Sequence, residues 1–264
     1  MRPSERQRHI LYLLNMHNKE WHVKDLAKRY HVSELTIRRD LDLLAQSGDV
    51  IRTLGGCIST GDGSIGTIFD QEFELNLDLK VAIGKEAARY VQAGDTLLLG
   101  DGSTIFQLSA FMTDIDNTNI YTNNLAAIKQ LSRSAKVSLF LLGGKYDYQY
   151  NMLLLKGSLA DRILETLRFD IIFIGADGMD LNGQCMANDQ EVARTNQIIL
   201  RQGRKKILLA DHTKVERTAS CIFGHLNDFD LWITSKGIDE EQMNKFRKHT
   251  KIIEVPPDRF FARM

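Results

Sequence analysis

Cysteine, net charge and long apolar segments are all scarce in this chain of 264 residues. Its three cysteines, Cys57, Cys185 and Cys221, are odd in number and far apart, which favours a reducing compartment and predicts neither a disulfide framework nor a zinc site. No apolar run approaches the ~20 residues that span a bilayer, and the N-terminus lacks the apolar core of a secretory signal. We therefore expect a cytoplasmic protein with no membrane partner, no metal site and no cofactor.

The formal net charge of zero hides an uneven distribution. Residues 1–60 hold 10 Lys/Arg against 7 Asp/Glu, whereas the rest of the chain holds 24 against 27. Four of the seven histidines also lie in residues 1–60. With 43% hydrophobic and 26% charged residues, the composition is that of a soluble globular protein. A weakly basic head on a weakly acidic body is typical of a chain whose N-terminal part binds an anion.

Residues 3–47 have the periodicity of three short helices. The spacing of apolar residues predicts one helix over 4–16 and a second over 23–30, and Ser33 is a favourable N-cap for the third. The stretch VIRTLGGCI that follows predicts a short hairpin with a Gly-Gly turn. The expected core residues of the helices are Ile10, Leu13, Leu14, Val23, Leu26, Ala27, Ile37, Leu41 and Leu44. Three helices and a small hairpin predict a winged helix-turn-helix.

Two adjacent arginines, Arg38 and Arg39, lie in the third predicted helix. With Ile37 facing the core, the rotation of 100° per residue places Arg39 outward and Arg38 to one side. These arginines form either an ordinary solvated surface or an edge that binds DNA. In a winged helix-turn-helix the third helix enters the major groove, where arginine can bind guanine or phosphate. The predicted DNA-binding residues are Ser33, Thr36 and Arg39 for bases, Lys28, Arg38 and Arg52 for the backbone, and Glu34 beside them.

The pattern changes after the head. Residues 61–78 begin with small residues and lack a strong period, so we expect a DNA-binding domain over 1–60, a linker over 61–78, and an effector-binding and oligomerisation domain over 79–264. From Leu79 onward, continuous apolar strands alternate with amphipathic helices, which predicts a mostly parallel sheet covered on both faces. The expected fold class is α/β, with an N-terminal winged helix-turn-helix followed by a mostly parallel α/β sensor domain.

Small and polar residues follow five of the predicted strands. Ligands of open α/β sheets bind beyond the carboxyl ends of the strands. The turn 101–104 leads into a helix, and its amides and hydroxyls could hold a phosphate. Each turn by itself is equally consistent with an ordinary strand end, but together they predict a shared site for a small phosphorylated, polyhydroxylated ligand. The predicted effector-binding residues are Asp101, Gly102, Ser103, Thr104, Thr122, Asn123, Asn124, Gly143, Gly144, Lys145, Asp177, Glu191 and Lys214.

Both halves resemble one family. The segments RQRHIL, VKDLAKRYHVSELTIRRDLDLLAQSG and VIRTLGGC resemble the DeoR-type bacterial transcriptional regulators, and TIRRDL is the most specific of these matches. The segments DGST, TNN, LGG, GADG and ADHTK resemble the sugar-phosphate-sensing domain of that family, which is similar in fold to ribose-5-phosphate isomerase. The resemblance extends from Arg6 to about Val255. It implies a repressor of a sugar or polyol catabolic operon that binds double-stranded operator DNA as a dimer or tetramer and is released by a phosphorylated effector.

Two departures from the family pattern bear on function. Many members have an arginine where this chain has Glu72, between Phe69 and the pair Asn76 and Lys80. If that arginine contacts the effector or a neighbouring subunit, the contact is lost or inverted here.

The second departure concerns catalysis. The isomerases have a Lys-Gly-Gly-Gly stretch where this chain has CMANDQEVAR, which leaves Asp177, Glu191 and Lys214 as ligand contacts without the full set for proton transfer. We therefore expect a regulator and no enzymatic activity. The alternatives are an isomerase-like enzyme that carries a DNA-binding head, and a constitutive repressor whose α/β part only oligomerises.

Overall fold

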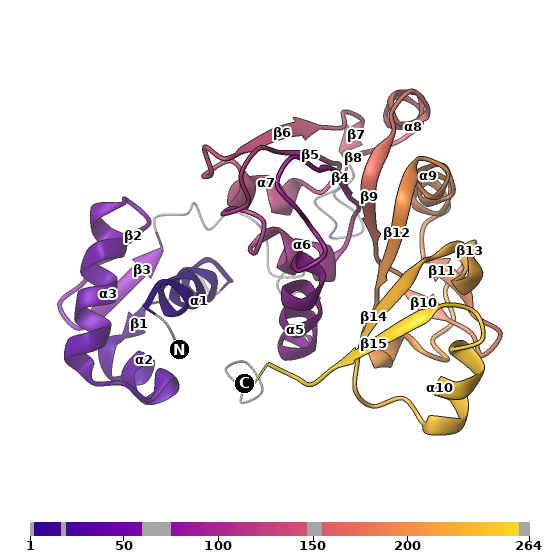
Figure 1. Ribbon diagram of the computed structural model, residues 1–264. Coiled ribbons are helices and arrows are strands. Elements are labelled where there is room, and N and C mark those ends of the chain that lie inside the picture. Colours follow the sequence, from indigo (N-terminus) through magenta and orange to yellow (C-terminus); the bar gives the residue numbers. More distant parts are fainter. Residues whose placement is uncertain (1–2, 17–19, 60–74, 147–154, 259–264) are drawn as a thin grey trace. The chain divides into compact units, whose positions relative to one another are not determined.

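The computed structural model describes residues 3–16, 20–59, 75–146 and 155–258 (Figure 1). The chain divides into two compact units, and the boundary between them lies after Asn76. Most of the predicted linker, including Phe69 and Glu72, lies outside the described residues. No helix within the described ranges is long and apolar enough to span a membrane.

The N-terminal unit combines three helices with a three-stranded antiparallel sheet. The helices are α1 (Pro3–Met16), α2 (Val23–Tyr30) and α3 (Glu34–Gln46). The strands β1 (Trp21–His22), β2 (Val50–Arg52) and β3 (Gly56–Ser59) have the order β1-β3-β2. The predicted helices and hairpin are confirmed. Strand β1 was not predicted, because a segment of two residues has no period to detect.

Local sequence explains these boundaries and the core. The hydroxyl of Ser33 accepts a hydrogen bond from the amide of Thr36, as expected of an N-cap. All of the predicted core residues of the three helices are buried. Gly56 allows β1 to pair closely with β3, because a Cβ atom at this position would lie 2.0 Å from the carbonyl oxygen of Trp21.

The C-terminal unit is built on a seven-stranded sheet in which every neighbouring pair is parallel. The strand order is β15-β14-β12-β9-β4-β5-β6. The strands are β4 (Thr96–Leu99), β5 (Thr118–Thr122), β6 (Val137–Leu141), β9 (Phe169–Ile174), β12 (Gly203–Leu209), β14 (Leu231–Ser235) and β15 (Lys251–Val255). The expected parallel α/β fold is confirmed.

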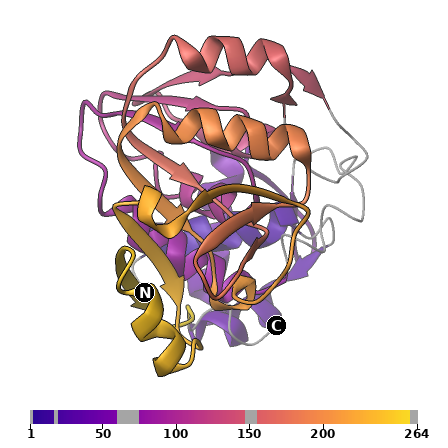
Figure 2. The same cartoon turned by 90° about the vertical axis from the view of Figure 1, so that its right-hand side faces the viewer.

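Helices cover both faces of this sheet, as the two views show (Figures 1 and 2). Alternate strand residues point to opposite faces, so Leu97 and Phe173 pack in one core cluster, and Leu98 and Ile172 pack in another. The first cluster includes residues of α5 (Leu77–Ala88), α6 (Ser103–Ser109) and α7 (Leu125–Leu131). The second includes residues of α8 (Ser158–Glu165), α9 (Gln190–Leu200) and α10 (Glu240–Phe246).

Smaller elements complete the C-terminal unit. An antiparallel sheet contains β10 (Gly178–Met179), β11 (Gln184–Ala187) and β13 (Cys221–His225), and a two-stranded sheet contains β7 (Lys145–Tyr146) and β8 (Leu155–Lys156). Two 3-10 helices are η1 (His212–Lys214) and η2 (Leu226–Asp228). None of these elements was predicted from the sequence.

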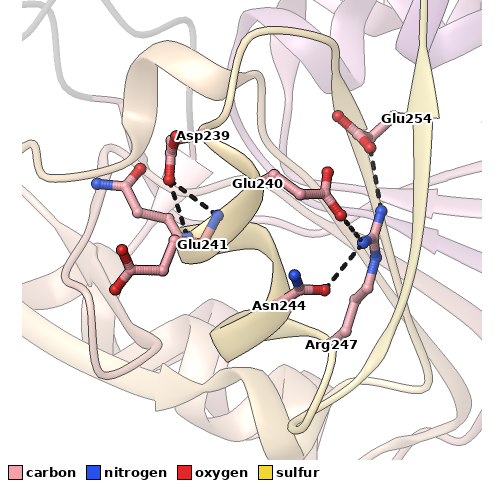
Figure 3. Close-up of polar contacts among 7 residues, drawn as sticks. Asp239, Glu240, Glu241, Asn244, Arg247 and Glu254 are labelled. Atoms are coloured by element: carbon pink, nitrogen blue, oxygen red, sulfur yellow. Dashed lines mark hydrogen bonds and ion pairs between the residues drawn. The ribbon is translucent and has the colours of Figure 1, made fainter.

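Polar contacts fix the end of α10 against the edge strand β15 (Figure 3). Asp239 caps α10 by accepting hydrogen bonds from the amides of Glu241 and Gln242 at 2.8 and 3.3 Å. Arg247 pairs with Glu240 on the same helix at 2.7 Å and reaches Glu254 on β15 at 3.4 Å. Because these side chains are partly exposed, we expect each ion pair to stabilise the fold only slightly.

Candidate functional site

One face of helix α3 is apolar and buried in the core, and the opposite face is exposed to solvent. Ile37 and Leu41 are fully buried, whereas Arg38 and Arg39 are exposed. The predicted rotation of the helix is therefore confirmed. It places both guanidinium groups where an external anion can reach them.

The two arginines differ in their partners. Arg38 Nη2 lies 3.8 Å from Glu34 Oε2, one turn earlier, and both side chains are about half exposed, so this pair is weak. Arg39 forms no hydrogen bond or ion pair with any residue that the structure describes. Neither charge is neutralised by a buried acid of the same unit.

Hydroxyl groups and a further cation lie near the start of α3. The hydroxyls of Ser33 and Thr36 are 2.8 Å apart and share a hydrogen bond. Lys28, in the last turn of α2, is exposed and has no ion-pair partner within the described ranges. The predicted contact residues of α2 and α3 are thus solvent-accessible, with Thr36 the most covered of them.

Arg52 is already held within the N-terminal unit. Its Nε lies 3.1 Å from Asp42 Oδ1 on α3, and its Nη1 donates to the carbonyl oxygen of Gly56 at 2.9 Å. These contacts fix the hairpin of β2 and β3 against α3. Arg52 therefore positions the wing, and its contact with a DNA phosphate stays a prediction.

In the C-terminal unit the strand order reverses between β4 and β9. From β4 the chain proceeds through β5 to the edge strand β6, and from β9 it proceeds through β12 and β14 to the opposite edge. The carboxyl ends of β4 and β9 lie together, since the amide of Gly100 donates to the carbonyl oxygen of Phe173 at 3.0 Å. Ligands of open α/β sheets bind at such a reversal. Asp101 and Gly102 follow β4 there, and Asp177 follows β9.

Hydrogen bonds join the neighbouring strand ends. Asn124, after β5, donates from Nδ2 to the carbonyl oxygen of Gly102 at 3.1 Å. The amide of Leu155, at the start of β8, donates to the carbonyl oxygen of Asn123 at 2.9 Å. Strand β8 is therefore placed at the end of β5, inside the predicted site.

A buried lysine on β8, Lys156, also belongs to this site at the strand ends. Lys156 Nζ lies 2.7 Å from Asp189 Oδ2 and 3.5 Å from Glu191 Oε2, and its side chain is only 4% exposed. Asp177 Oδ2 accepts a hydrogen bond from the amide of Asn188 at 2.8 Å, which places the end of β9 beside the start of α9. We call Asp101, Asp177, Lys156, Asp189 and Glu191 the acidic rim.

Two carboxyl groups of the acidic rim, those of Asp101 and Asp189, have pKa values shifted in opposite directions. Burial, together with the nearby carboxylates of Asp177 and Asp189, raises the pKa of Asp101 to about 7. Burial would also raise the pKa of Asp189, but hydrogen bonds from Lys156 and from the amide of Val192 outweigh it and lower that pKa. Asp101 can therefore donate or accept a hydrogen bond near neutral pH, whereas Asp189 accepts. No group of side chains suited to a metal ion is found among the described residues.

Two of the predicted effector-binding residues, Thr122 and Asn124, use their side chains for hydrogen bonds to the protein backbone. Thr122 Oγ1 donates to the carbonyl oxygen of Leu99 at 2.8 Å and accepts from the amide of Asn124 at 3.0 Å. Asn124 Oδ1 accepts from two amides at the start of α7. Between them, the buried Oδ1 of Asn123 has no hydrogen-bond partner among the described residues, so it is the side-chain acceptor of this turn that a ligand could use.

The turn after β4 has the expected form. Gly102 has a φ of +96°, a conformation that favours glycine, and Ser103 begins α6 directly after it. Ser103 is half-buried and Thr104 is buried. The two hydroxyl residues therefore line the start of a short helix beside Asp101, and whether they contact an effector stays a prediction.

The remaining predicted effector-binding residues are not part of the acidic rim. Gly143 and Gly144 follow β6, and a Cβ atom on Gly144 would lie 2.7 Å from the carbonyl oxygen of Lys156. Lys145 pairs with Lys156 across β7 and β8, and its side chain is exposed. Lys214 lies on η1 after β12, and no hydrogen bond or ion pair of its side chain joins it to the acidic rim within the part of the chain that is described. Lys145 is thus an exposed cation and Lys214 a partly exposed one, each near a strand end.

The sequence did not identify Lys156 or Asp189 as site residues. The signal for Asp189 was present, because an aspartate before the helical pattern of 190–200 is a typical N-cap, and it does cap α9. Lys156 had no local signal, since its partner Asp189 is 33 residues away.

Comparison with known families covers both units. Residues 6–61 match the model of the DeoR-like helix-turn-helix domain. Residues 75–236 match the model of the DeoR C terminal sensor domain.

Individual relatives support the same assignment. An uncharacterized HTH-type transcriptional regulator from Bacillus subtilis is 30% identical over 96% of this chain and 97% of its own length. A lactose phosphotransferase system repressor from Lactococcus lactis is 29% identical over 88% of this chain and 91% of its own length. Among solved structures, a ribose 5-phosphate isomerase from Plasmodium falciparum aligns with 53% of each chain at 17% identity and a TM-score of 0.37.

Proposed function

The chain belongs to the DeoR family of transcriptional regulators, and on that premise we propose that it represses a sugar or polyol catabolic operon until a phosphorylated effector binds its sensor domain. It is a transcriptional repressor of this family and not an enzyme. The operator-binding surface is the outer face of α3, and the effector site is the set of strand ends around the acidic rim.

The observation that carries the DNA-binding part of the proposal is the outward position of Arg38 and Arg39 on the third helix of a winged helix-turn-helix. Arg39 has no partner among the described residues, so it loses no internal contact when it binds a base or a phosphate. Arginine at this place can bind guanine through two hydrogen bonds or neutralise a phosphate. We infer that the N-terminal half of α3 reads the major groove of double-stranded operator DNA.

The chemistry of the strand ends supports a phosphorylated, polyhydroxylated effector. Carboxylates of the acidic rim and the free Oδ1 of Asn123 can accept hydrogen bonds from sugar hydroxyls. Lys145, which is exposed, and Lys214, which is partly exposed, can pair with a phosphate, which the acidic rim itself would repel. The name of the Lactococcus relative, a repressor of a lactose phosphotransferase system, supports an effector linked to sugar uptake.

We infer that the protein acts in the cytoplasm as a homo-oligomer, a dimer or a tetramer. Helix-turn-helix proteins read two half-sites about one helical turn apart, which requires two heads. The effector can release the operator only by binding a DNA-incompetent arrangement more tightly than a DNA-competent one. A change from about 99:1 to 1:99 requires an affinity difference of about 10⁴ between those two arrangements.

A binding assay on the full chain tests this function. A fluorescent duplex enriched from a random-sequence pool by the protein serves as the operator probe. We expect nanomolar to micromolar binding that is reversed by one or a few phosphorylated sugars or polyols, and not by the same compounds without phosphate. Lack of any enriched duplex would refute the DNA-binding role. Binding that none of the phosphorylated compounds alters would refute effector control and support a constitutive repressor.

A further inference from the structure

An apolar side chain lies at the tip of the proposed DNA-reading surface. Leu35 is the second residue of α3, and 59% of its surface is exposed. Single exposed leucines are common on protein surfaces and need no explanation by themselves. Leu35 differs because of where it lies on this helix.

The helix rotation places Leu35 on the outermost stripe of α3. At 100° per residue it shares that stripe with Arg39, Asp42 and Gln46, all of which are exposed, and it is opposite the buried Ile37. Leu35 is the N-terminal member of the stripe. The N-terminal residues of such a helix are those that reach the base edges in the major groove.

The chemistry of this position restricts what Leu35 can bind. A leucine side chain neither donates nor accepts hydrogen bonds, and the hydroxyls of its neighbours Ser33 and Thr36 are 2.8 Å apart and bonded to each other. The major-groove edges of the bases present donors, acceptors and one apolar group, which is the C5 methyl of thymine. An exposed leucine therefore gains most by burying that methyl.

We propose that Leu35 is a specificity-determining residue that packs on a thymine methyl in the operator, an inference that rests on the DNA-binding function proposed above. Leu35 and Arg39 are four residues apart, about 6 Å along the helix axis. This distance is about two base-pair steps. The thymine therefore lies within about two base pairs of the base or phosphate that Arg39 contacts.

The proposal can be tested by removing one methyl group at a time from the DNA. The full-length protein and the enriched duplex are used, and each thymine is replaced in turn by uracil, which removes only the C5 methyl. For the unaltered protein we expect affinity to fall about fourfold at one thymine, or at one per half-site, which is the effect of exposing one buried methyl group. For Leu35→Ala we expect weaker binding to the thymine duplex and no further loss when that thymine becomes uracil.

Leu43 provides a matched control. It lies on the same helix, two turns farther from the N-terminus, and 54% of its surface is exposed. Leu43→Ala should keep the full discrimination between thymine and uracil. The proposal is overturned if no uracil duplex binds more weakly to the unaltered protein, or if Leu35→Ala keeps the same discrimination.

Failure of the inference can be told apart from failure of the DNA-binding function. If no duplex is enriched, or if Arg38→Ala/Arg39→Ala binds the duplex as tightly as the unaltered protein, the assignment of α3 to DNA is wrong and the role of Leu35 falls with it. If the double arginine variant loses binding while uracil has no effect, α3 binds DNA and only the thymine contact is wrong.

Discussion

The Nε of Arg6 on α1 lies 2.6 Å from the Oδ2 of Asp40 on α3, and both side chains are buried. The Nε2 of Gln7 donates to the second oxygen of Asp40 at 3.0 Å, so the carboxylate is hydrogen-bonded at both oxygens. Because Asp40 follows the outward-facing Arg39 directly, its pairing with α1 also fixes the direction in which Arg39 points.

We predict that Asp40→Ala destabilises the N-terminal unit by about 3–5 kcal/mol, because it leaves a buried guanidinium without its partner. Calorimetry of the full chain should show this as a lower unfolding temperature for one transition, with the transition of the C-terminal unit unchanged. Asp42 is on the same helix as Asp40, and Asp42→Ala, which breaks the more exposed pair with Arg52 of β2, should cost about 1 kcal/mol or less. Equal effects of the two substitutions would contradict the structural role of Asp40.

The two arginines of α3 should act differently on operator binding. If Arg38 contacts a phosphate, Arg38→Ala should weaken binding to all duplexes and flatten the plot of log K against log[salt] by about one unit. If Arg39 reads a base, Arg39→Ala should reduce discrimination at one base pair by about 1–3 kcal/mol. Arg89→Ala, which removes an exposed arginine of the C-terminal unit, is the control and should leave both quantities unchanged.

The raised pKa of Asp101 predicts how stability depends on pH. The unfolded carboxyl has its ordinary pKa of 3.8 and the folded one about 7, so between these values the folded state holds a proton that the unfolded state has lost. The free energy of unfolding should therefore fall as pH rises from about 4 to about 7. In Asp101→Asn this part of the decrease is absent, and the unfolding temperature of the C-terminal unit should vary less between pH 5 and pH 8. Parallel pH profiles for the two proteins would show that Asp101 is not the group that titrates.

Removal of Lys156 should destabilise the C-terminal unit, because the neighbouring carboxylates then repel one another. In Lys156→Met, Asp189 and Glu191 lose their cation, and the pKa of Asp189 should rise because the hydrogen bond and the charge of Lys156, which both lower it, are removed. We expect a loss of about 3–5 kcal/mol at pH 8. The loss should be smaller at pH 5, where protonation relieves the repulsion.

Lys145→Met tests whether this effect is specific. Lys145 is directly opposite Lys156 in the pairing of β7 with β8, but its side chain is exposed. Its removal should change the unfolding temperature little at either pH. A destabilisation that is the same for both variants, or that does not depend on pH, would count against the ion pairs of Lys156 as its cause.

Local sequence patterns were sufficient for most of the architecture. The apolar spacing of Ile37, Leu41 and Leu44 fixed the rotation of α3, and the hydroxyl of Ser33 marked its start. Continuous apolar segments identified the strands of the parallel sheet. Segments too short to have a period, such as β1 at Trp21–His22 and β8 at Leu155–Lys156, could not be predicted in this way.

The candidate site was predicted only in part, because some of its contacts join residues with no local sequence signal. Asp101, Asp177 and Glu191 were expected from the residue types at strand and helix ends, and in the structure Asp101 lies near Asp177 while Glu191 lies near Lys156. Lys156 was missed because nothing near it in sequence indicates that it is buried. Arg52 was predicted to contact the DNA backbone, and its pairing with Asp42, ten residues earlier and 3.1 Å away, was not foreseen.

The sequence by itself determined the two units, the helices and parallel strands, the outward direction of Arg38 and Arg39, and the polar character of the strand ends. These features can be predicted because the side-chain periods of the helix and the strand repeat within a short segment of sequence. Tertiary structure alone decided that β9 pairs with β4, that β8 joins the end of β5, and that Lys156 therefore meets Asp189. Such contacts depend on which distant strands pair, and the free energy that selects the pairing comes from the burial of the whole sheet rather than from any one segment.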